Sequence, residues 1–254
     1  MKKQIFLNAA RQCYRDNPIM LRHIDEMEKS YRSTEVISWC FRSPFPFRFL
    51  HHAIRAHNKD QLRVCRSVFI DVFHTFEKHP QRRTTDQFYR GMKLPNEVVD
   101  KFEAHVGQMV STSGFFPSTR SRSNALALAS LPAYRPDLLP VLFKIDCDQL
   151  SVYIELTNKY PSPLLAFELC SAFRIVHVNR GAITVIKIKT DHDSGRRLAS
   201  RYLEQHANVT LESLIDELIT PPKPPTPPPP PVSKSTSQPT SASNPVRYFE
   251  SFLH

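Results

Sequence analysis

The sequence of 254 residues is poor in glycine, has no long hydrophobic run and has an odd number of cysteines. Its five glycines form neither a GxGxxG nor a GxxxxGK pattern, so the two commonest phosphate-binding loops are absent. No apolar run approaches the roughly 18 residues of a membrane span, and the start of the chain has no signal-like apolar stretch. The five widely spaced cysteines argue against a disulfide framework and against a CxxC metal site. We therefore expect a reduced, cytoplasmic protein outside the membrane.

A metal-binding spacing is missing as well, although histidine is frequent. The chain has 11 histidines, but none forms an HExxH pattern or an i, i+4 pair beside a third ligand. We expect exposed or capping histidines and no bound metal.

Proline, in contrast, is abundant in one segment. Residues 221–245 hold 11 of the 22 prolines and no acidic residue. Such a segment buries too little apolar surface to offset the entropy of ordering it, so we expect a disordered tail over residues 221–254. Its proline run favours polyproline II, the conformation that SH3- or WW-type domains bind, and residues 221–231 are the expected site for such a partner. A plain spacer is the alternative.

The rest of the chain changes its periodicity near residue 84. Between residues 58 and 79 apolar residues recur at steps of three and four, which predicts an amphipathic helix. Shorter stretches before residue 58 show the same spacing and also predict helices. After residue 84 many short runs alternate in the manner of strands, with few helices among them. We therefore predict an α+β fold, with a helical subdomain at 1–83 and a mixed-sheet core at 84–220. The expected strands are Gln87–Arg90, Gln108–Ser113, Val141–Cys147, Val152–Glu155, Leu164–Leu169, Phe173–Val178 and Ala182–Ile188, and the expected helices are Asn96–His105, Arg122–Ala129, Gly195–Gln205 and Leu211–Leu218.

The order of several short motifs in this core resembles a known family. Phe88-Tyr89-Arg90-Gly91 ends the first strand, and the segment Gly107–Arg120 follows about one helix later, before a helix that contains Ala125 and Leu126. A strand with Phe143 and a later Phe173-Arg174-Ile175 complete the set. This order is similar to that of the arginine-specific mono-ADP-ribosyltransferases of the R-S-E class, and the similarity spans roughly residues 5–190.

The resemblance implies a reaction and a cofactor. Members of this family transfer ADP-ribose from NAD to an acceptor arginine on a protein and release nicotinamide, through an oxocarbenium-like state. In the family an arginine holds a phosphate of NAD, and a serine strand positions that arginine. In the Glu-x-Glu pair the first glutamate orients the acceptor guanidinium, and the second hydrogen-bonds the nicotinamide ribose. NAD would be the co-substrate, and no metal is implied.

Carried over residue by residue, the resemblance assigns the cofactor side of the site to five residues. Arg90 matches the phosphate-binding arginine, next to Gly91, and Phe115 precedes the position of the serine strand. The spacing to the following helix places Pro117-Ser118-Thr119 in that position, although Ser111-Thr112-Ser113 is the literal match. In the favoured alignment the first serine is replaced by a proline, which has no hydroxyl group.

The catalytic glutamates have no match. Counting back from Phe173 places Ser162 and Leu164 where the acidic pair belongs, and residues 156–167 contain no carboxylate. Glu168, four residues beyond the expected position, is the one candidate for the catalytic acid, and a structural role is its alternative.

Three hypotheses remain open at this point. The first is a working transferase with a relocated glutamate, and the second is a non-catalytic member that acts through binding. The third is a basic nucleic-acid-binding protein, because the net charge is +10, but we expect the aromatic residues of the strands to form a core rather than a base-stacking surface.

Overall fold

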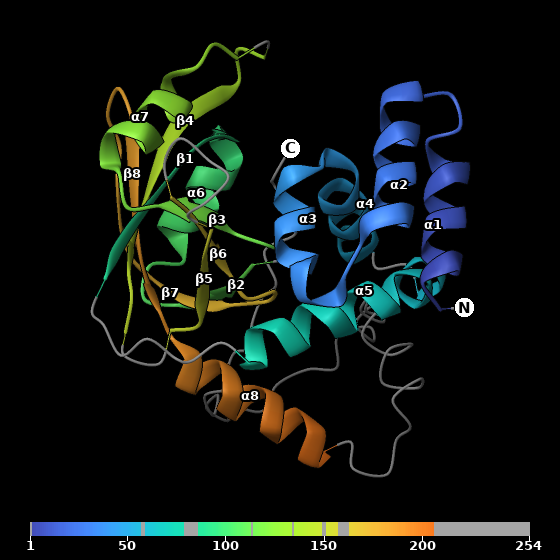
Figure 1. Ribbon diagram of the computed structural model, residues 1–254. Helices are drawn as coiled ribbons and strands as arrows, with labels where there is room; N and C mark the ends of the chain where they lie inside the picture. The colour runs from blue at the N-terminus through green and yellow to red at the C-terminus, as the bar shows by residue number, and fades with distance from the viewer. Residues whose placement is uncertain are drawn as a thin grey trace, which may run out of the picture.

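The computed structural model describes residues 2–56, 59–78, 86–112, 114–133, 135–148, 151–156 and 163–205. Helices α1 to α5 form one half of the molecule, and the strands form a sheet in the other half (Figure 1). The predicted α+β fold, with a helical block before a mixed sheet, is therefore confirmed. The tail at 221–254 and the helix predicted at Leu211–Leu218 lie outside the described residues.

Local sequence determines where the helices of the block begin. The side chain of Asn17 accepts the N–H of Met20 at 3.1 Å and so caps α2, with Pro18 in its first turn. Pro44 likewise begins α4, because proline fits a first helical turn. The elements are α1 (Lys2–Cys13), α2 (Pro18–Ser30), the short 3-10 helix η1 (Ser33–Glu35), α3 (Val36–Arg42), α4 (Pro44–Arg55) and α5 (Lys59–Lys78).

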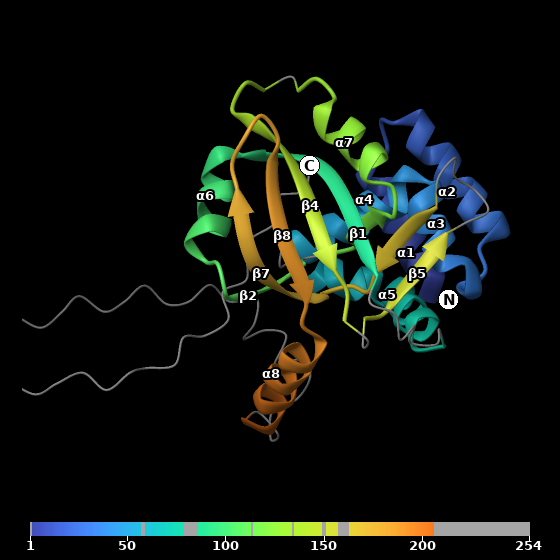
Figure 2. The same ribbon diagram turned by 90° about the vertical axis from the view of Figure 1, so that its left-hand side faces the viewer.

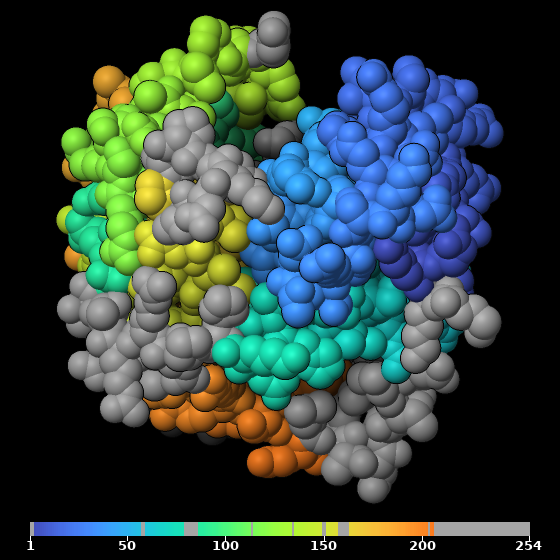
Figure 3. All heavy atoms as spheres, viewed as in Figure 1, coloured from blue at the N-terminus to red at the C-terminus, as the bar shows by residue number. Residues whose placement is uncertain are grey.

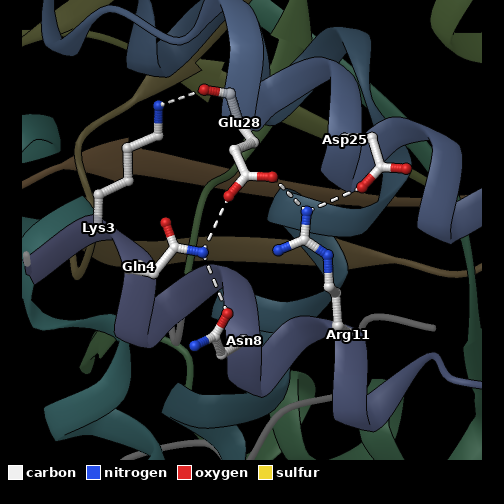
Figure 4. A network of polar contacts seen from close by, with 6 residues as sticks. All are labelled: Lys3, Gln4, Asn8, Arg11, Asp25 and Glu28. Atoms are coloured by element: carbon white, nitrogen blue, oxygen red, sulfur yellow. Dashed lines mark hydrogen bonds and ion pairs between the residues drawn. The ribbon is translucent and has the colours of Figure 1, made fainter.

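A polar network joins α1 to α2 on the outside of the block (Figure 4). Arg11 contacts Asp25 at 2.8 Å and Glu28 at 2.5 Å, while Gln4 donates to the other carboxylate oxygen of Glu28 at 2.9 Å. Lys3 donates to the backbone oxygen of Glu28 at 3.2 Å. Exposed contacts of this kind contribute little each, so the network positions the two helices and offers no reactive group.

The sheet contains the strands in the order β2-β7-β8-β4-β1-β3-β6-β5. β4 and β8 are parallel, and the other neighbouring pairs are antiparallel. Figure 2 shows β7, β8, β4 and β1 side by side. The strands are β1 (Gln87–Pro95), β2 (Met109–Ser111), β3 (Pro117–Thr119), β4 (Leu138–Asp146), β5 (Tyr153–Leu156), β6 (Leu164–Phe167), β7 (Ala172–Asn179) and β8 (Thr184–Thr190).

β1 is more than twice as long as the strand predicted at Gln87–Arg90. It pairs with β4 along its whole length, from Gln87 opposite Asp146 to Pro95 opposite Leu138. The predicted strand ended just before Gly91, but Gly91 lies within β1 and pairs with Leu142 of β4. The extra length gives the middle of the sheet a continuous pair of long strands.

Three helices accompany the sheet: α6 (Asn96–Ala104), α7 (Arg122–Ser130) and α8 (His192–Gln205). The last begins three residues before the predicted start at Gly195. Asp191 explains the difference, because its carboxylate accepts the N–H of Ser194 at 3.3 Å and caps the first turn.

One buried cluster contains residues from both sides of residue 83. Phe115, Ala166 and Leu169, from the sheet half of the sequence, belong to the same buried cluster as the aromatic core of the helical block. A second cluster lies within the sheet half and includes Phe88 and Phe143. The helical block and the sheet half therefore share part of their buried core. The largest buried side chains of the helical block are Trp39, Phe6, Phe45 and Phe76.

Candidate functional site

Arg90 is a half-buried cation on β1, in the middle of the sheet. Its Nη1 donates to the backbone oxygen of Pro117 at 2.9 Å, and its guanidinium carbon lies 4.7 Å from the ring centre of Phe116. Its Nε atom is buried and has no hydrogen-bond partner. An unsatisfied buried donor typically costs about 1–3 kcal/mol, so this N–H is a group that a bound acceptor would satisfy.

The charges near Arg90 are of its own sign. Within the described ranges no carboxylate forms an ion pair with it, and the neighbouring charge that acts on it is Arg55. Burial, and then the charge of Arg55, lower the pKa of Arg90 to about 10. The group still carries its positive charge at neutral pH, so the site has a positive potential with no matching anion.

His51 links the helical block to this site. Its Nε2 accepts the backbone N–H of Phe115 at 3.1 Å, which requires a neutral ring with its proton on Nδ1. The ring stacks on Phe47 with 4.1 Å between centres, and a Cβ on Gly114 would come within 2.5 Å of it. Burial, and then the charges of Arg55 and Arg90, lower the pKa of His51 to about 3. The histidine is therefore a neutral acceptor, and α4 holds the segment at 114–115 closely.

The strand proposed as the serine strand lies directly beside β1. Thr119 is opposite Tyr89, and Ser118 is opposite Leu165 of β6. The Ser118 hydroxyl is buried and donates to the backbone oxygen of Phe116 at 3.2 Å. The Thr119 hydroxyl accepts the N–H of Ser121 at 3.1 Å. Both side chains thus support the backbone that carries the acceptor of Arg90.

The alternative serine segment lies at the other end of the sheet. Ser111 is in β2, which pairs with β7, and its hydroxyl donates to the backbone oxygen of Cys170 at 2.9 Å. Four strands separate β2 from β3 in the sheet order. Of the two segments, Pro117–Thr119 is the one that the fold brings to Arg90, and Ser113 is outside the described residues.

Gly91 and Phe115, the other two residues assigned to the cofactor side, are packed into the protein. A Cβ on Gly91 would lie 1.6 Å from the backbone oxygen of Ala125, so only glycine lets α7 approach β1 this closely. The Phe115 ring is fully buried, with its centre 5.5 Å from that of Phe41. These two residues shape the surroundings of Arg90 through packing.

Glu168 follows the last residue of β6. Burial raises the pKa of its carboxyl, and Arg196 of α8 is the nearby charge that opposes this shift. Its backbone oxygen accepts both the N–H and the hydroxyl of Ser171. In the part of the chain that the structure describes, its side chain makes no hydrogen bond or ion pair with Arg90 or Ser118. The three side chains do not converge through direct contacts.

Arg55 and His51 are the two site residues that sequence reasoning missed. They are four residues apart on α4, so they lie on one face of that helix, and His51 is buried among aromatic residues. A basic pair on an otherwise apolar helix face was the available signal. In the space-filling view the surface is hollowed between the helical block and the part of the sheet half drawn in green (Figure 3).

Comparisons with known proteins identify the fold. No protein-family model and no curated protein matches the chain. Among solved structures it is similar to Vis, an ADP-ribosyltransferase toxin from Vibrio splendidus. The complex of Vis with the M6 inhibitor is 18% identical and has a TM-score of 0.52, with 65% of this chain and 75% of that chain covered. The complex with agmatine is 19% identical, with a TM-score of 0.52 and coverage of 65% and 76%.

The chain therefore has an ADP-ribosyltransferase fold. The described residues were also searched for a membrane-spanning helix and for a metal-binding cluster. There, no helix combines the length and the apolar character needed to cross a membrane. Nor do three or more histidine, cysteine, aspartate or glutamate side chains gather there in a way that would hold a metal ion.

Proposed function

We propose that this chain is an ADP-ribosyltransferase-like protein that binds an anionic dinucleotide of the NAD class at Arg90 and has little or no transferase activity. The observation that carries the proposal is the environment of Arg90. Arg90 is half-buried, its Nε is buried without a hydrogen-bond partner, the charge of Arg55 acts on it, and no carboxylate of the described residues forms an ion pair with it. A bound anion would accept a hydrogen bond from the Nε of Arg90 and would balance its positive charge.

The pyrophosphate of a dinucleotide fits this requirement. A guanidinium fork forms paired, charge-assisted hydrogen bonds to phosphate oxygens, and Arg90 still has a donor to give. Its Nη1 is already fixed by Pro117, so the fork is oriented before a ligand arrives. The resemblance of the Arg90 segment to the family motif, and the fold shared with Vis, support NAD as the ligand.

The weak catalysis rests on the missing acids. The positions aligned with the Glu-x-Glu pair are Ser162 and Leu164, and the nearby candidate, Glu168, is close to Arg196 of α8 rather than to Arg90. Loss of one preorganised electrostatic group typically costs about 10²–10³ in rate. Because no carboxylate among the described residues pairs with Arg90, we expect the developing positive charge on a nicotinamide ribose to have no such group to stabilise it.

Calorimetric titration of the full chain tests the binding half of the proposal. NAD and ADP-ribose should both bind the unaltered protein, and Arg90→Gln should weaken both by at least tenfold because the phosphate loses its charged partner. Arg48→Gln is the matched control, since Arg48 is exposed on α4. Equal affinities for Arg90→Gln and the unaltered protein would contradict the proposal.

Nicotinamide release tests the catalytic half. We expect none above background when the protein is mixed with NAD and an arginine-rich acceptor. Labelling of the acceptor with ADP-ribose that is lost in Glu168→Gln would instead establish Glu168 as a relocated catalytic acid. The acceptor arginine, a cytoplasmic location and an SH3- or WW-type partner for residues 221–231 stay predictions.

A further inference from the structure

A positively charged surface lies on the side of the sheet that faces away from Arg90. Successive residues of a strand point to opposite faces of a sheet, so Tyr89 and Arg90 of β1 lie on opposite sides. Arg90 is opposite Phe143, which belongs to the core of the sheet half, whereas Tyr89 is opposite Lys144. Figure 2 views the sheet from the side away from the helical block, with β7, β8, β4 and β1 in front. The side of these four strands that carries Tyr89 and Lys144 is called the outer face.

Three lysines meet on the outer face of β4 and β8. In this parallel pair Lys144 of β4 is opposite Lys187 of β8. Two residues further along, Asp146 is opposite Lys189. The intervening residue of β8, Ile188, is buried, so the two lysines of this strand both point to the outer face.

The lysines of this cluster outnumber its carboxylate. Lys187 forms an ion pair with Asp146 at 2.7 Å. In the part of the chain that the structure describes, Lys144 and Lys189 form no ion pair. Two positive charges on adjacent strands are therefore left without a partner, and a molecule that brings carboxylates to this face would complement them.

A β-bulge adds an exposed apolar side chain to the same face. The register of β7 on β8 shifts between Ile175, opposite Ile188, and His177, opposite Lys187, which leaves Val176 as the extra residue. Ile175 is fully buried, whereas Val176 is 41% exposed and His177 is exposed as well. The bulge thus turns two successive side chains to the outer face, beside the lysines.

These features favour an acidic polypeptide over a nucleic acid as the partner. Lys187 and Lys189 are about 7 Å apart along β8, which matches the spacing of alternate side chains in an extended peptide. Single-stranded nucleic acids are usually bound by several aromatic rings on which bases stack. Among the described residues of the four strands, Tyr89 is the one aromatic side chain on this face, and its hydroxyl donates to Gln87 at 2.5 Å.

We propose that the outer face of β7, β8, β4 and β1 binds an acidic segment of a partner protein. Carboxylates of that segment pair with Lys144 and Lys189, and an apolar residue beside them packs on Val176. This surface lies on the opposite side of β1 from Arg90, so the inference goes beyond the proposed function and does not depend on it. Because the charged groups are exposed, added salt should weaken the interaction.

Fluorescence anisotropy of a labelled oligoglutamate peptide that contains two leucines tests the proposal on the full chain. Lys144→Gln/Lys189→Gln should weaken binding by about tenfold, as expected for the loss of two exposed ion pairs. The matched control is Arg22→Gln/Lys29→Gln, which removes the same charge from exposed positions of α2 and should change the affinity by less than twofold. Equal Tm values for the two double variants would show that the loss of binding is not a loss of folding.

Two further variants separate the parts of the surface. Val176→Thr keeps the β-branched shape, and it should remove the advantage of the leucine-containing peptide over plain oligoglutamate. Arg90→Gln should leave peptide affinity unchanged, because Arg90 faces the other side of the sheet.

Three outcomes would overturn the proposal. The first is no binding of the peptide by the unaltered chain, and the second is equal affinity in Lys144→Gln/Lys189→Gln and the unaltered chain. The third is tighter binding of an oligothymidylate of equal length that the same double variant weakens, which would make the outer face a nucleic-acid surface.

Discussion

At the scale of single residues, the site depends on which groups are charged. Arg90 and Arg55 keep their charge, while His51 is held neutral between them and serves as an acceptor for the Phe115 amide. A protonated His51 would lose that acceptor and would add a third positive charge. The neutral state of His51 thus preserves its hydrogen bond with the Phe115 amide and avoids a further positive charge near Arg90.

This arrangement predicts a pH dependence of stability. The pKa of His51 is lowered in the folded protein to about 3 from an ordinary value of 6.5, so the unfolded chain binds the proton more readily. The stabilisation is fully present above pH 6.5 and is lost as the pH falls toward 3, by at most about 1.4 kcal/mol per pH unit. His51→Gln keeps an acceptor without a titrating group, so its free energy of unfolding should fall less steeply in this window.

Urea unfolding between pH 7 and pH 4 measures the effect. His192→Gln is a suitable control, because burial also lowers the pKa of His192 but that residue contacts Val152 rather than Phe115. Each variant should remove only the contribution of its own histidine to the slope of the unfolding free energy against pH. Identical slopes for His51→Gln and the unaltered protein would show that His51 is not held neutral by the fold.

Sequence reasoning reached some of these residues and not others. Arg90 and Pro117–Thr119 were found because a motif order preserves their spacing along the chain. Arg55 and His51 were missed because α4 comes near this site only through tertiary packing, in which His51 accepts the N–H of Phe115, a residue 64 positions later in the chain.

At the scale of elements, the close approach of α7 to β1 depends on Gly91. A Cβ there would lie 1.6 Å from the oxygen of Ala125 and 2.8 Å from the nitrogen of Ala129, and neither backbone atom can give way cheaply. Gly91→Ala should therefore displace α7 and lower the free energy of unfolding by more than 2 kcal/mol, roughly the upper range of overpacking changes.

Gly181→Ala provides the comparison, since the nearest atom to a Cβ there is 3.7 Å away. Thermal unfolding should show a large fall in Tm for Gly91→Ala and almost none for Gly181→Ala. Similar Tm values for the two variants would mean that the packing of α7 on β1 is looser than described.

The elements themselves were largely predictable, and their errors have physical causes. Alternation of apolar and polar residues located most of the strands near their observed bounds. The end of β1 was placed too early because Gly91 reads as a strand terminator, whereas its pairing with Leu142 and the contact with α7 retain it in the strand. The start of α8 was placed late because the capping side chain of Asp191 lies before the apparent periodicity.

At the scale of the whole molecule, the fold joins a helical block and a sheet through a shared buried core. The tail contributes a net charge of +2, from Lys223, Lys234 and Arg247 against Glu250, so the remaining 220 residues carry 10 − 2 = +8. Arg90 contributes to this excess in the part of the chain that the structure describes. In the proposed function, this positive charge and the missing Glu-x-Glu pair belong to one site, which would hold a dinucleotide anion and have few groups to cleave it.

Ligand-observed NMR on NAD mixed with the full chain tests this central claim most directly, because one sample reports both binding and cleavage. The account predicts saturation transfer from the protein to intact NAD, its loss in Arg90→Gln, and no growth of free nicotinamide signals over hours. Free nicotinamide that accumulates in proportion to the unaltered protein, or the absence of any transfer to NAD, would contradict it.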